Sequence, residues 1–358
     1  MIGKKGGGPA RAGASKAAPL KAGTLKDVAD LVGVSVSTVS RALTGKGLIG
    51  KDTEERIRKA AEAVNYRANT LARGLKTQRS RLIGLMVHNL VGTSHRLLAE
   101  LAQQRLGAAG YQVILSVTSD DPEQEARFLD TLENYRAEGL IIIPTGRNGA
   151  RLARFAQAGV PVVAVIRRQE ELELETILHA NEEGAYAGTR YLLDLGHRDI
   201  GFIVGRADTT SGRERYTGHV RALKEAGERP DPSRIHFGSY RPETGFRACE
   251  AMLGSGRPPT ALFVANHEAS MGAMKYVTEQ GIAVPEQLSL LCYEDVAWFS
   301  WHKPAISVVD SGSQRLAELA VERLLLRLGE GASPAPARPL EHRVDAGLII
   351  RESCAPPR

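Results

Sequence analysis

Residues 24–43 read TLKDVADLVGVSVSTVSRAL, and their pattern decides the first part of the fold. Apolar residues recur at helical spacing after Thr24, so a short amphipathic helix is expected to begin there. Gly33 interrupts this pattern, because a tight turn can use the positive φ that glycine tolerates. Ser35 then serves as the N-cap of a second helix over residues 36–43. Two short helices joined by a glycine-containing turn predict a helix-turn-helix.

A third helix is expected to complete this N-terminal domain. Asp52 and Glu55 form a D-x-x-E capping pattern, and Ile57, Ala60, Ala61 and Val64 repeat at i, i+3, i+4 and i+7. Asn65-Tyr66 ends the pattern. We therefore expect a disordered basic tail over residues 1–22 and a three-helix domain that begins at residue 23.

The hydropathy pattern of the sequence changes at Arg81, where short apolar runs begin to alternate with amphipathic stretches. The predicted strands cover residues 82–87, 111–117, 139–144, 160–166, 200–204, 261–265, 288–292 and 305–309. The predicted helices cover residues 95–109, 122–137, 149–158, 183–195, 212–226, 243–253, 268–280 and 312–328. Alternating strands and helices predict an α/β core of doubly wound parallel sheets, in two subdomains.

The charge is divided unevenly along the 358 residues, whose formal net charge is +6. Residues 1–80 carry 16 Lys and Arg against 6 Asp and Glu, which leaves the remainder of the chain at −4. A basic N-terminal segment followed by a mildly acidic remainder predicts that the N-terminal segment binds a polyanion. Three cysteines, no run of about 18 apolar residues and no secretory signal favour a cytoplasmic protein, placed on the nucleoid when bound to DNA.

The segment from Thr24 to Leu43 closely resembles the lactose-repressor (LacI–GalR) family of bacterial transcription regulators. Further matches to the family follow in order along the chain: Asn65-Tyr66-Arg67, Leu71-Ala72-Arg73-Gly74-Leu75, Leu195-Gly196-His197-Arg198, Arg215 three residues before Gly218, and Ala265-Asn266. The resemblance spans residues 23–355. It implies a DNA-binding headpiece over residues 23–68 and a hinge helix with its linker over residues 69–80. It also implies a core similar to periplasmic sugar-binding proteins, over residues 81–355, in which two subdomains close around a small effector.

The same resemblance implies three crossings between the subdomains, which we expect near Ala180, Ser307 and Arg338. The N-subdomain would then comprise residues 81–180 and 308–338, and the C-subdomain residues 181–307 and 339–355. It also implies a homodimer on a pseudo-palindromic operator in double-stranded DNA, because the two-fold axis of the protein mirrors that of the DNA.

The family motif places the second helix of the headpiece in the major groove. Arg41 would contact guanine, Ser37 would donate or accept at a base edge, and Val36 would pack on a thymine methyl. Phosphate contacts are expected from Thr24, Ser35, Thr38, Ser40 and Lys51, although helix capping explains a serine or threonine at such positions equally well. In the hinge, Leu75 would wedge between base steps of the minor groove, beside Asn69, Ala72 and Arg73.

The effector site is predicted from positions that match the family's pocket. These residues are Arg215, Tyr240, Asn266, His267, Glu294, Asp295, Arg167 and Trp298. Ile166 stands where the family commonly has an aspartate, and His267 replaces the aspartate after Asn266. A pocket that loses carboxylates while keeping Arg215 favours an acidic effector, such as a sugar acid or another small carboxylate, over a neutral sugar. A repressor without effector control remains an alternative.

Enzymatic chemistry is not expected. The sequence contains no HExxH or GxSxG motif, and the P-loop-like run at residues 45–51 is followed by Asp52 in place of the required Ser or Thr. We therefore predict no catalytic residue, no metal site and no cofactor. A solute-binding protein would fit residues 81–355 alone, and a carbohydrate-processing enzyme on the same fold is a third hypothesis. Neither hypothesis explains the basic headpiece.

Overall fold

The computed structural model describes residues 23–44, 49–66, 79–329 and 341–358, with the side chain of Thr44 left aside. The chain divides into two units, one ending at Gln78 and the other beginning at Arg79. The hinge residues Asn69, Ala72, Arg73 and Leu75 and the basic tail lie outside the described residues. Within the described ranges, no helix is both long and apolar enough to cross a membrane.

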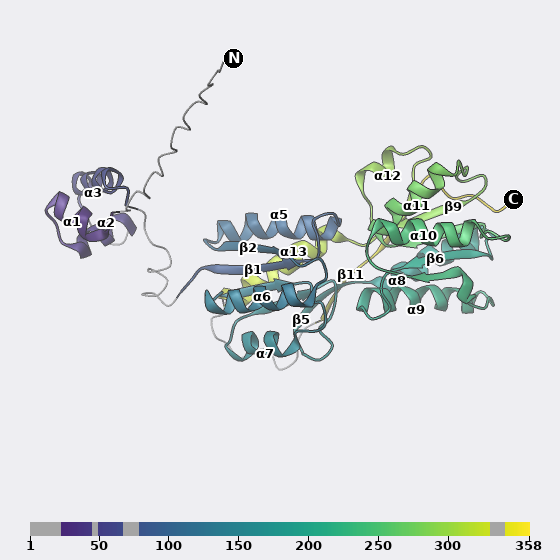
Figure 1. Ribbon diagram of the computed structural model, residues 1–358, viewed down its shortest axis with the longest axis horizontal. Coiled ribbons are helices and arrows are strands. Elements are labelled where there is room, and N and C mark those ends of the chain that lie inside the picture. The colour runs from purple at the N-terminus through teal and green to yellow at the C-terminus, as the bar shows by residue number, and fades with distance from the viewer. Residues whose placement is uncertain (1–22, 45–48, 67–78, 330–340) are drawn as a thin grey trace, which may run out of the picture. The chain divides into compact units, whose positions relative to one another are not determined.

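The headpiece contains three helices, α1 (Leu25–Val32), α2 (Val36–Thr44) and α3 (Lys51–Ala63), as Figure 1 shows. They enclose a small core in which Val28, Val39 and Ile57 are fully buried. Gly33 adopts φ 75°, which confirms the predicted left-handed turn. The prediction that Asp52 caps the third helix is wrong. That helix begins two residues earlier than a cap at Asp52 would place it, after the N-cap Gly50, so Asp52 lies inside its first turn.

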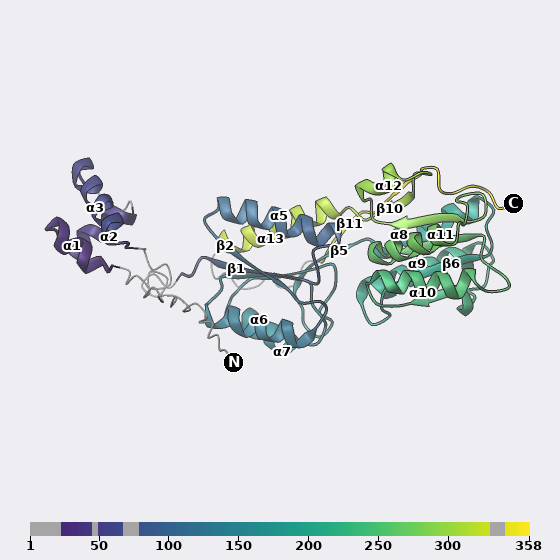
Figure 2. The ribbon, with the colours of Figure 1, turned by 45° about the horizontal axis from the view of Figure 1, so that its top comes forward.

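The core unit is built from two six-stranded sheets, as the alternating pattern predicts. The first sheet has the order β11-β5-β4-β3-β1-β2 and is parallel throughout. Its strands are β1 (Leu82–Val87), β2 (Gln112–Val117), β3 (Gly139–Ile142), β4 (Val162–Val165), β5 (Glu175–His179) and β11 (Glu341–Val344). Helices α5 (Thr93–Ala108) and α13 (Ser313–Gly329) cover one face, and α6 (Pro122–Asn134) and α7 (Gly149–Gln157) cover the other (Figures 1 and 2).

The second sheet repeats this arrangement in the order β12-β10-β9-β8-β6-β7, with only β12 antiparallel to its neighbour. Its strands are β6 (Ile200–Val204), β7 (Ile235–Phe237), β8 (Ala261–Ala265), β9 (Ser289–Tyr293), β10 (Ser307–Asp310) and β12 (Gly347–Ile349). Helices α10 (Pro242–Leu253) and α11 (His267–Glu279) pack on one face, and α8 (Asn181–Asp194) and α9 (Thr210–Glu225) pack on the other. The short helix α12 (Ala297–Trp301) follows β9.

The chain passes between the two sheets at Ala180, after Asp310 and after Val344. The crossings expected near Ser307 and Arg338 were therefore placed too early. Ser307 pairs with Leu291 in the second sheet, so β10 belongs to the C-subdomain. Glu341 pairs with Thr176 in the first sheet, so β11 belongs to the N-subdomain. Four short or edge strands, β5, β7, β11 and β12, were absent from the expected set.

Glycines allow the paired helices of the C-subdomain to pack closely. A Cβ on Gly218 of α9 would lie 2.1 Å from the carbonyl oxygen of Glu182, which belongs to α8. Helices α10 and α11 approach each other in the same way. A Cβ on Gly245 of α10 would lie 1.8 Å from the carbonyl oxygen of Ala269, and a Cβ on Gly272 of α11 would lie 1.7 Å from that of Pro242. Any larger side chain would force these backbones apart. The glycine of α9 therefore fixes the position of Arg215, one turn earlier on the same helix.

Candidate DNA interface and effector cleft

The second helix of the headpiece presents the face that the sequence assigns to DNA. Val36, Ser37 and Arg41 are exposed, whereas Val39 and Ala42 pack into the headpiece core. The Arg41 side chain folds back along the helix, where its Nε donates to the carbonyl oxygen of Ser37 at 3.4 Å. An exposed guanidinium on a helix of this kind has the reach and donor geometry to read a base edge.

The hydroxyl side chains of the headpiece have structural roles. Thr24 forms a capping box with Asp27, since its hydroxyl accepts from the Asp27 amide and the Asp27 carboxylate accepts from the Thr24 amide at 2.7 Å. Ser35 accepts from the Thr38 amide at 3.1 Å, which confirms it as an N-cap. Thr38 and Ser40 are half-buried, and Lys51 is exposed at the start of α3.

A cavity of about 390 Å³ lies between the two subdomains. Most of its walls come from residues that directly follow parallel strands, where ligands of open α/β sheets commonly bind. The N-subdomain contributes His88, Asn89, Gly92, Ser94, His95, Ser119, Asp120, Ile166, Arg167 and His179. The C-subdomain contributes Arg206, Ser211, Arg215, Ser239, Tyr240, Arg241, Asn266, Glu268 and Glu294.

Backbone strain is concentrated on the walls of this cavity. Ser119, Asp120, Ile166 and Glu294 all have positive φ, at 52°, 64°, 66° and 69°. The conformation is especially costly for Ile166, because its β-branched side chain disfavours the left-handed region. Residues kept in such conformations cluster at ligand sites, where the surrounding structure holds them in place. The strain is thus an indication of function that is independent of the charge pattern.

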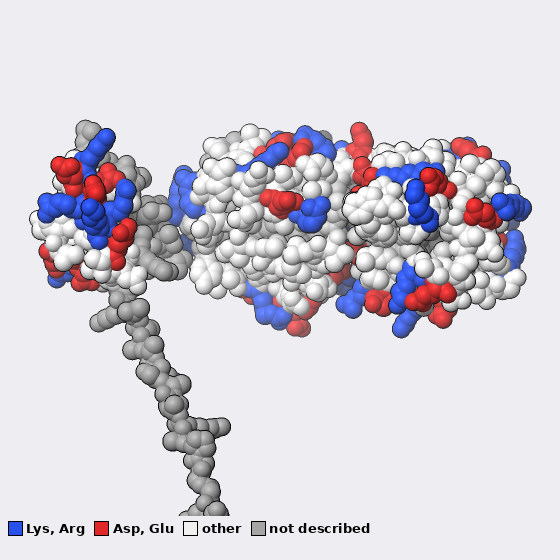
Figure 3. Space-filling view, turned by 90° about the horizontal axis from the view of Figure 1, so that it is seen from above, with Lys and Arg blue, Asp and Glu red and all other residues white. Residues whose placement is uncertain are grey.

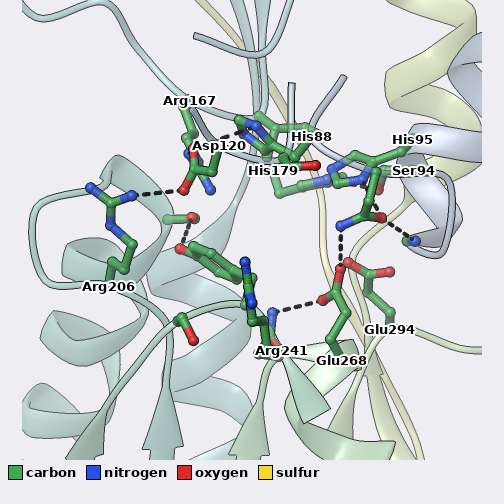
Figure 4. A pocket seen from close by; sticks show the side chains of 18 of the residues that line it. His88, Ser94, His95, Asp120, Arg167, His179, Arg206, Arg241, Glu268 and Glu294 are labelled. Atoms are coloured by element: carbon green, nitrogen blue, oxygen red, sulfur yellow. Dashed lines mark hydrogen bonds and ion pairs between the residues drawn. The ribbon is translucent and has the colours of Figure 1, made fainter. Parts of the chain in front are cut away.

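One end of the cavity is organised around Asp120 (Figure 4). Its carboxylate accepts from Arg167 of the N-subdomain and from Arg206 of the C-subdomain, at 2.7 Å each. The bridge therefore joins the two subdomains across the cleft. Arg167 also lies 4.9 Å from the centre of the Tyr240 ring, a cation–π arrangement. Burial, followed by the charge of Arg167, keeps the pKa of the adjacent His88 well below its usual value, so this ring is neutral.

The other end of the cavity carries two carboxylates, Glu268 and Glu294 (Figure 4). The amides of Asn89 and Asn266 donate to the two oxygens of Glu268 at 3.1 Å, and the contact from Asn89 crosses the cleft. Burial, reinforced by the negative charge of Glu268, raises the pKa of Glu294 to about 7. Oε2 of Glu294 is buried without a hydrogen-bond partner among the described residues.

Arg215 is buried in the floor of the cavity. Its Nε donates to Oδ1 of Asn181 at 2.9 Å, and its Nη1 donates to the carbonyl oxygen of Ala265 at 2.8 Å. The guanidinium also lies 3.8 Å from the centre of the Tyr293 ring. These contacts fix the orientation of Arg215, so it is a rigid cation rather than a member of a surface ion pair.

Ser94 and His179 form a buried hydrogen-bonded cluster beside the cavity. Nδ1 of His179 lies 2.6 Å from the carbonyl oxygen of Ser311, which can only accept, so this nitrogen carries the proton. The unprotonated Nε2 then accepts from the Ser94 hydroxyl at 3.2 Å. Burial lowers the pKa of His179 to about 3, which keeps the ring neutral. The cluster consequently adds polarity, but no charge, to the cavity.

The structure brings together five of the eight residues expected at the effector site: Arg167, Arg215, Tyr240, Asn266 and Glu294. The other three, His267, Asp295 and Trp298, line a separate cavity of about 310 Å³. Asp295 is bound there by Arg351, with both carboxylate oxygens 2.9 Å from Nη2. The argument that His267 makes the effector pocket less anionic is therefore wrong, since the next residue, Glu268, lines that pocket instead.

Sequence reasoning missed several lining residues that carry the charge of the cleft, above all Asp120, Arg206 and Glu268. A signal for some of them was present, because Arg206 and Glu268 lie within three residues of the ends of predicted strands. Asp120 also lies three residues after a predicted strand, but it reaches the cleft through the left-handed conformation of the loop between β2 and α6, which the sequence pattern does not reveal.

The two units, a helix-turn-helix and a cleft between two doubly wound subdomains, define the class of ligand-responsive DNA-binding proteins. Residues 24–69 match the lacI family of bacterial regulatory proteins, and residues 189–354 match the periplasmic binding protein-like domain. The HTH-type transcriptional repressor PurR of Haemophilus influenzae (strain PittEE) is 30% identical over 305 residues, covering 85% of this chain and 91% of that protein. PurR of Pasteurella multocida is 28% identical over 308 residues, with coverages of 86% and 92%.

A solved structure of the lac repressor dimer, bound to operator and the anti-inducer ONPF, aligns with a TM-score of 0.79. It is 26% identical and covers 94% of this chain and all of that one. The chain belongs to the LacI family. Members of this family bind DNA and small-molecule effectors, and the relatives named above are transcriptional repressors, not enzymes.

Proposed function

We propose that the protein is a homodimeric repressor that binds a pseudo-palindromic operator under the control of a small polar effector, a sugar or sugar acid. The observation that carries this proposal is the cleft, in which charged side chains from both subdomains surround one cavity. A ligand held there contacts both subdomains and therefore favours one of their relative orientations. A coupling of about 1–3 kcal/mol would change operator affinity about 5- to 150-fold.

Base recognition is assigned to Val36, Ser37 and Arg41, and backbone contacts to Thr24, Ser35, Thr38, Ser40 and Lys51. Exposure of the first three residues on one helix supports their role. The hinge residues Asn69, Ala72, Arg73 and Leu75 are proposed to enter the minor groove on the basis of the sequence motif alone. Phosphate contacts set the register of the headpiece, whereas base contacts select the sequence.

Dimerisation is supported by a surface of the core that carries few charged side chains over a wide area (Figure 3). Large apolar residues are exposed on the core, among them Trp301 at 74%, Val91 at 57% and Leu90 at 47%. Val91 and Trp298, which lies one turn before Trp301, line the same cavity, so the loop after β1 and helix α12 are neighbours. Exposed apolar residues on neighbouring segments are typical of protein interfaces.

The test is selection of genomic fragments by the full-length protein, followed by gel shifts over a salt series. The affinity of a specific complex should fall as the salt concentration rises. A plot of the logarithm of the association constant against the logarithm of the salt concentration should have a slope of about −0.9 for each phosphate contacted. Arg41→Ala should weaken the specific complex by about 1–3 kcal/mol and reduce discrimination against a substituted guanine. Lys59→Ala, on the exposed side of α3, serves as the matched loss of one positive charge. Failure to enrich any fragment would reject the proposal.

A further inference from the structure

The effector cavity is electrically divided. Figure 4 places Arg167, Arg206 and Asp120 toward one side and Glu268 and Glu294 toward the other. The four arginines on its walls, Arg167, Arg206, Arg215 and Arg241, face three carboxylates, so the cavity as a whole is close to neutral. The charges are unevenly placed, because Arg167 and Arg206 share the single carboxylate of Asp120 at one end, whereas Glu268 and Glu294 lie at the other end with Arg215 as the cation that acts on Glu294.

The arginine-rich end has unused capacity for an anion. Arg241, which Figure 4 places between the two ends, is exposed at the cavity wall and has no ion-pair partner in the part of the chain that the structure describes. Arg167, which is 95% buried, uses Nη1 for Asp120, and a planar guanidinium offers further N–H groups in a fixed fork. A carboxylate matches that fork in shape and charge.

One carboxylate oxygen at the glutamate end, Oε2 of Glu294, lacks a donor among the described residues. The two amides that contact Glu268 leave the neighbouring Glu294 with Oε2 buried and unpaired. A buried acceptor without a partner is costly, and two carboxylates side by side add repulsion to that cost. A neutral hydroxyl would satisfy the acceptor but leave the repulsion, whereas a protonated amine would relieve both.

Resting on the proposed function, we propose that the effector is amphoteric: a small polar molecule that carries a carboxylate and a protonated amine, as amino acids and amino-sugar acids do. Its carboxylate binds at Arg167 and Arg241, and its ammonium donates to Glu294 and Glu268. A purely anionic ligand leaves the glutamate end unsatisfied and is repelled by it. A purely cationic ligand leaves the arginine-rich end unsatisfied in the same way. The volume of about 390 Å³ suits a small metabolite.

The first experiment identifies what the full-length protein retains from a total small-molecule extract of bacterial cells, by mass spectrometry after washing and denaturation. We expect a compound that contains both charged groups. Retention of only neutral or singly charged compounds, or of none, overturns the proposal.

The second experiment uses calorimetric titration with pairs that differ by an amine in place of a hydroxyl: glucosaminate with gluconate, serine with glycerate, and aspartate with malate. At least one amino member should bind about 10- to 100-fold more tightly than its hydroxy partner, the range expected for a charge-assisted hydrogen bond at a buried carboxylate. Equal or weaker binding of the amino members throughout overturns the proposal.

Glu294→Gln keeps the size of the side chain and removes its charge, so it should abolish the preference for the amine. Glu268→Gln should do the same and provides a second variant if the first does not fold. Glu182→Gln, whose side chain pairs with Arg221 outside the cavity, is the matched control and should leave the preference intact. Fragment selection by the headpiece is independent of these titrations. Operator binding that responds to a neutral sugar would therefore overturn the amphoteric ligand while leaving the proposed function standing.

Discussion

The bridge from Asp120 to Arg206 should hold the cleft closed when no effector is bound, and Asp120→Asn tests this directly. Asparagine is nearly isosteric and tolerates the positive φ of this position, so the loop should survive the change. The variant removes the negative charge that Asp120 shares with Arg167 and Arg206. The side chain of Arg167 is only 6% exposed. Asp120 and Arg206 are 20% and 34% exposed.

The size of the effect follows from this intermediate burial. Exposed ion pairs contribute about 0–1 kcal/mol, whereas removing one member of a buried pair costs about 3–5 kcal/mol. A value of about 1–3 kcal/mol is expected here, which would raise the population of the open cleft about 5- to 150-fold. The Arg168 amide reports on opening, because it donates across the interface to the Thr210 hydroxyl at 3.1 Å.

Hydrogen exchange of the Arg168 amide in the ligand-free protein should accelerate by the same factor in Asp120→Asn. The matched control is Asp130→Asn, which removes an aspartate that pairs with Arg151 and Arg154 inside the N-subdomain. Exchange at Arg168 that is equally fast in the two variants would refute the idea that the bridge closes the cleft.

Three further predictions concern titration, packing and capping. Because the folded pKa of Glu294 is raised to about 7, above its usual value, the group stabilises the fold fully below about pH 4.5, and this contribution is lost as the pH rises to about 7. Glu294→Gln should reduce that loss of stability by on the order of 3 kcal/mol. The quantity to measure is the difference in thermal stability between the variant and the wild type at each pH, because His95 and His179 titrate with the opposite sign in both proteins and cancel in the difference. Parallel stability curves for the two proteins would contradict the prediction. Gly218→Ala should lower thermal stability by about 1–3 kcal/mol, because the added methyl group clashes with the Glu182 carbonyl oxygen. The control Gly107→Ala in α5, which has open space around it, should be neutral or stabilising. Equal effects of the two substitutions would reject the close-packing argument. Thr24→Ala should destabilise the headpiece by about 1 kcal/mol, seen as faster exchange of the Asp27 amide, while Thr217→Ala in α9 should leave that amide unaffected.

The sequence predicts the elements of the fold because periodicity and capping are local properties. The helix-turn-helix follows from Gly33, Ser35 and the spacing of buried apolar residues, all of which the structure confirms. Most central strands follow from continuous apolar runs, which are typical of parallel sheets covered on both faces. The three-residue edge strands β7 and β12 carry too little pattern to be found, and β5 and β11 are interrupted by charged or polar residues.

The crossings and the site composition depend on long-range pairing. Nothing in residues 305–310 indicates which of the two sheets they join, and only the pairing with β9 decides it. The positions of His267 and Glu268 are equally hard to predict, because neighbouring residues on a helix point in different directions. Asn266 caps α11 and fixes its start, so Glu268 lines the effector cavity while His267 lines the other one.

Two of the hydrogen bonds that cross the cleft among the described residues lie at opposite ends of the cavity. Asp120 joins Arg206 at the arginine-rich end, and Asn89 joins Glu268 at the glutamate end. A carboxylate arriving near Arg167 competes with Asp120 for its arginines, and an ammonium at the glutamate end competes with Asn89 for Glu268. A ligand with a single charged group alters one connection and leaves the other in place. An amphoteric ligand replaces both at once, and it therefore alters contacts between the two subdomains at both ends of the cavity.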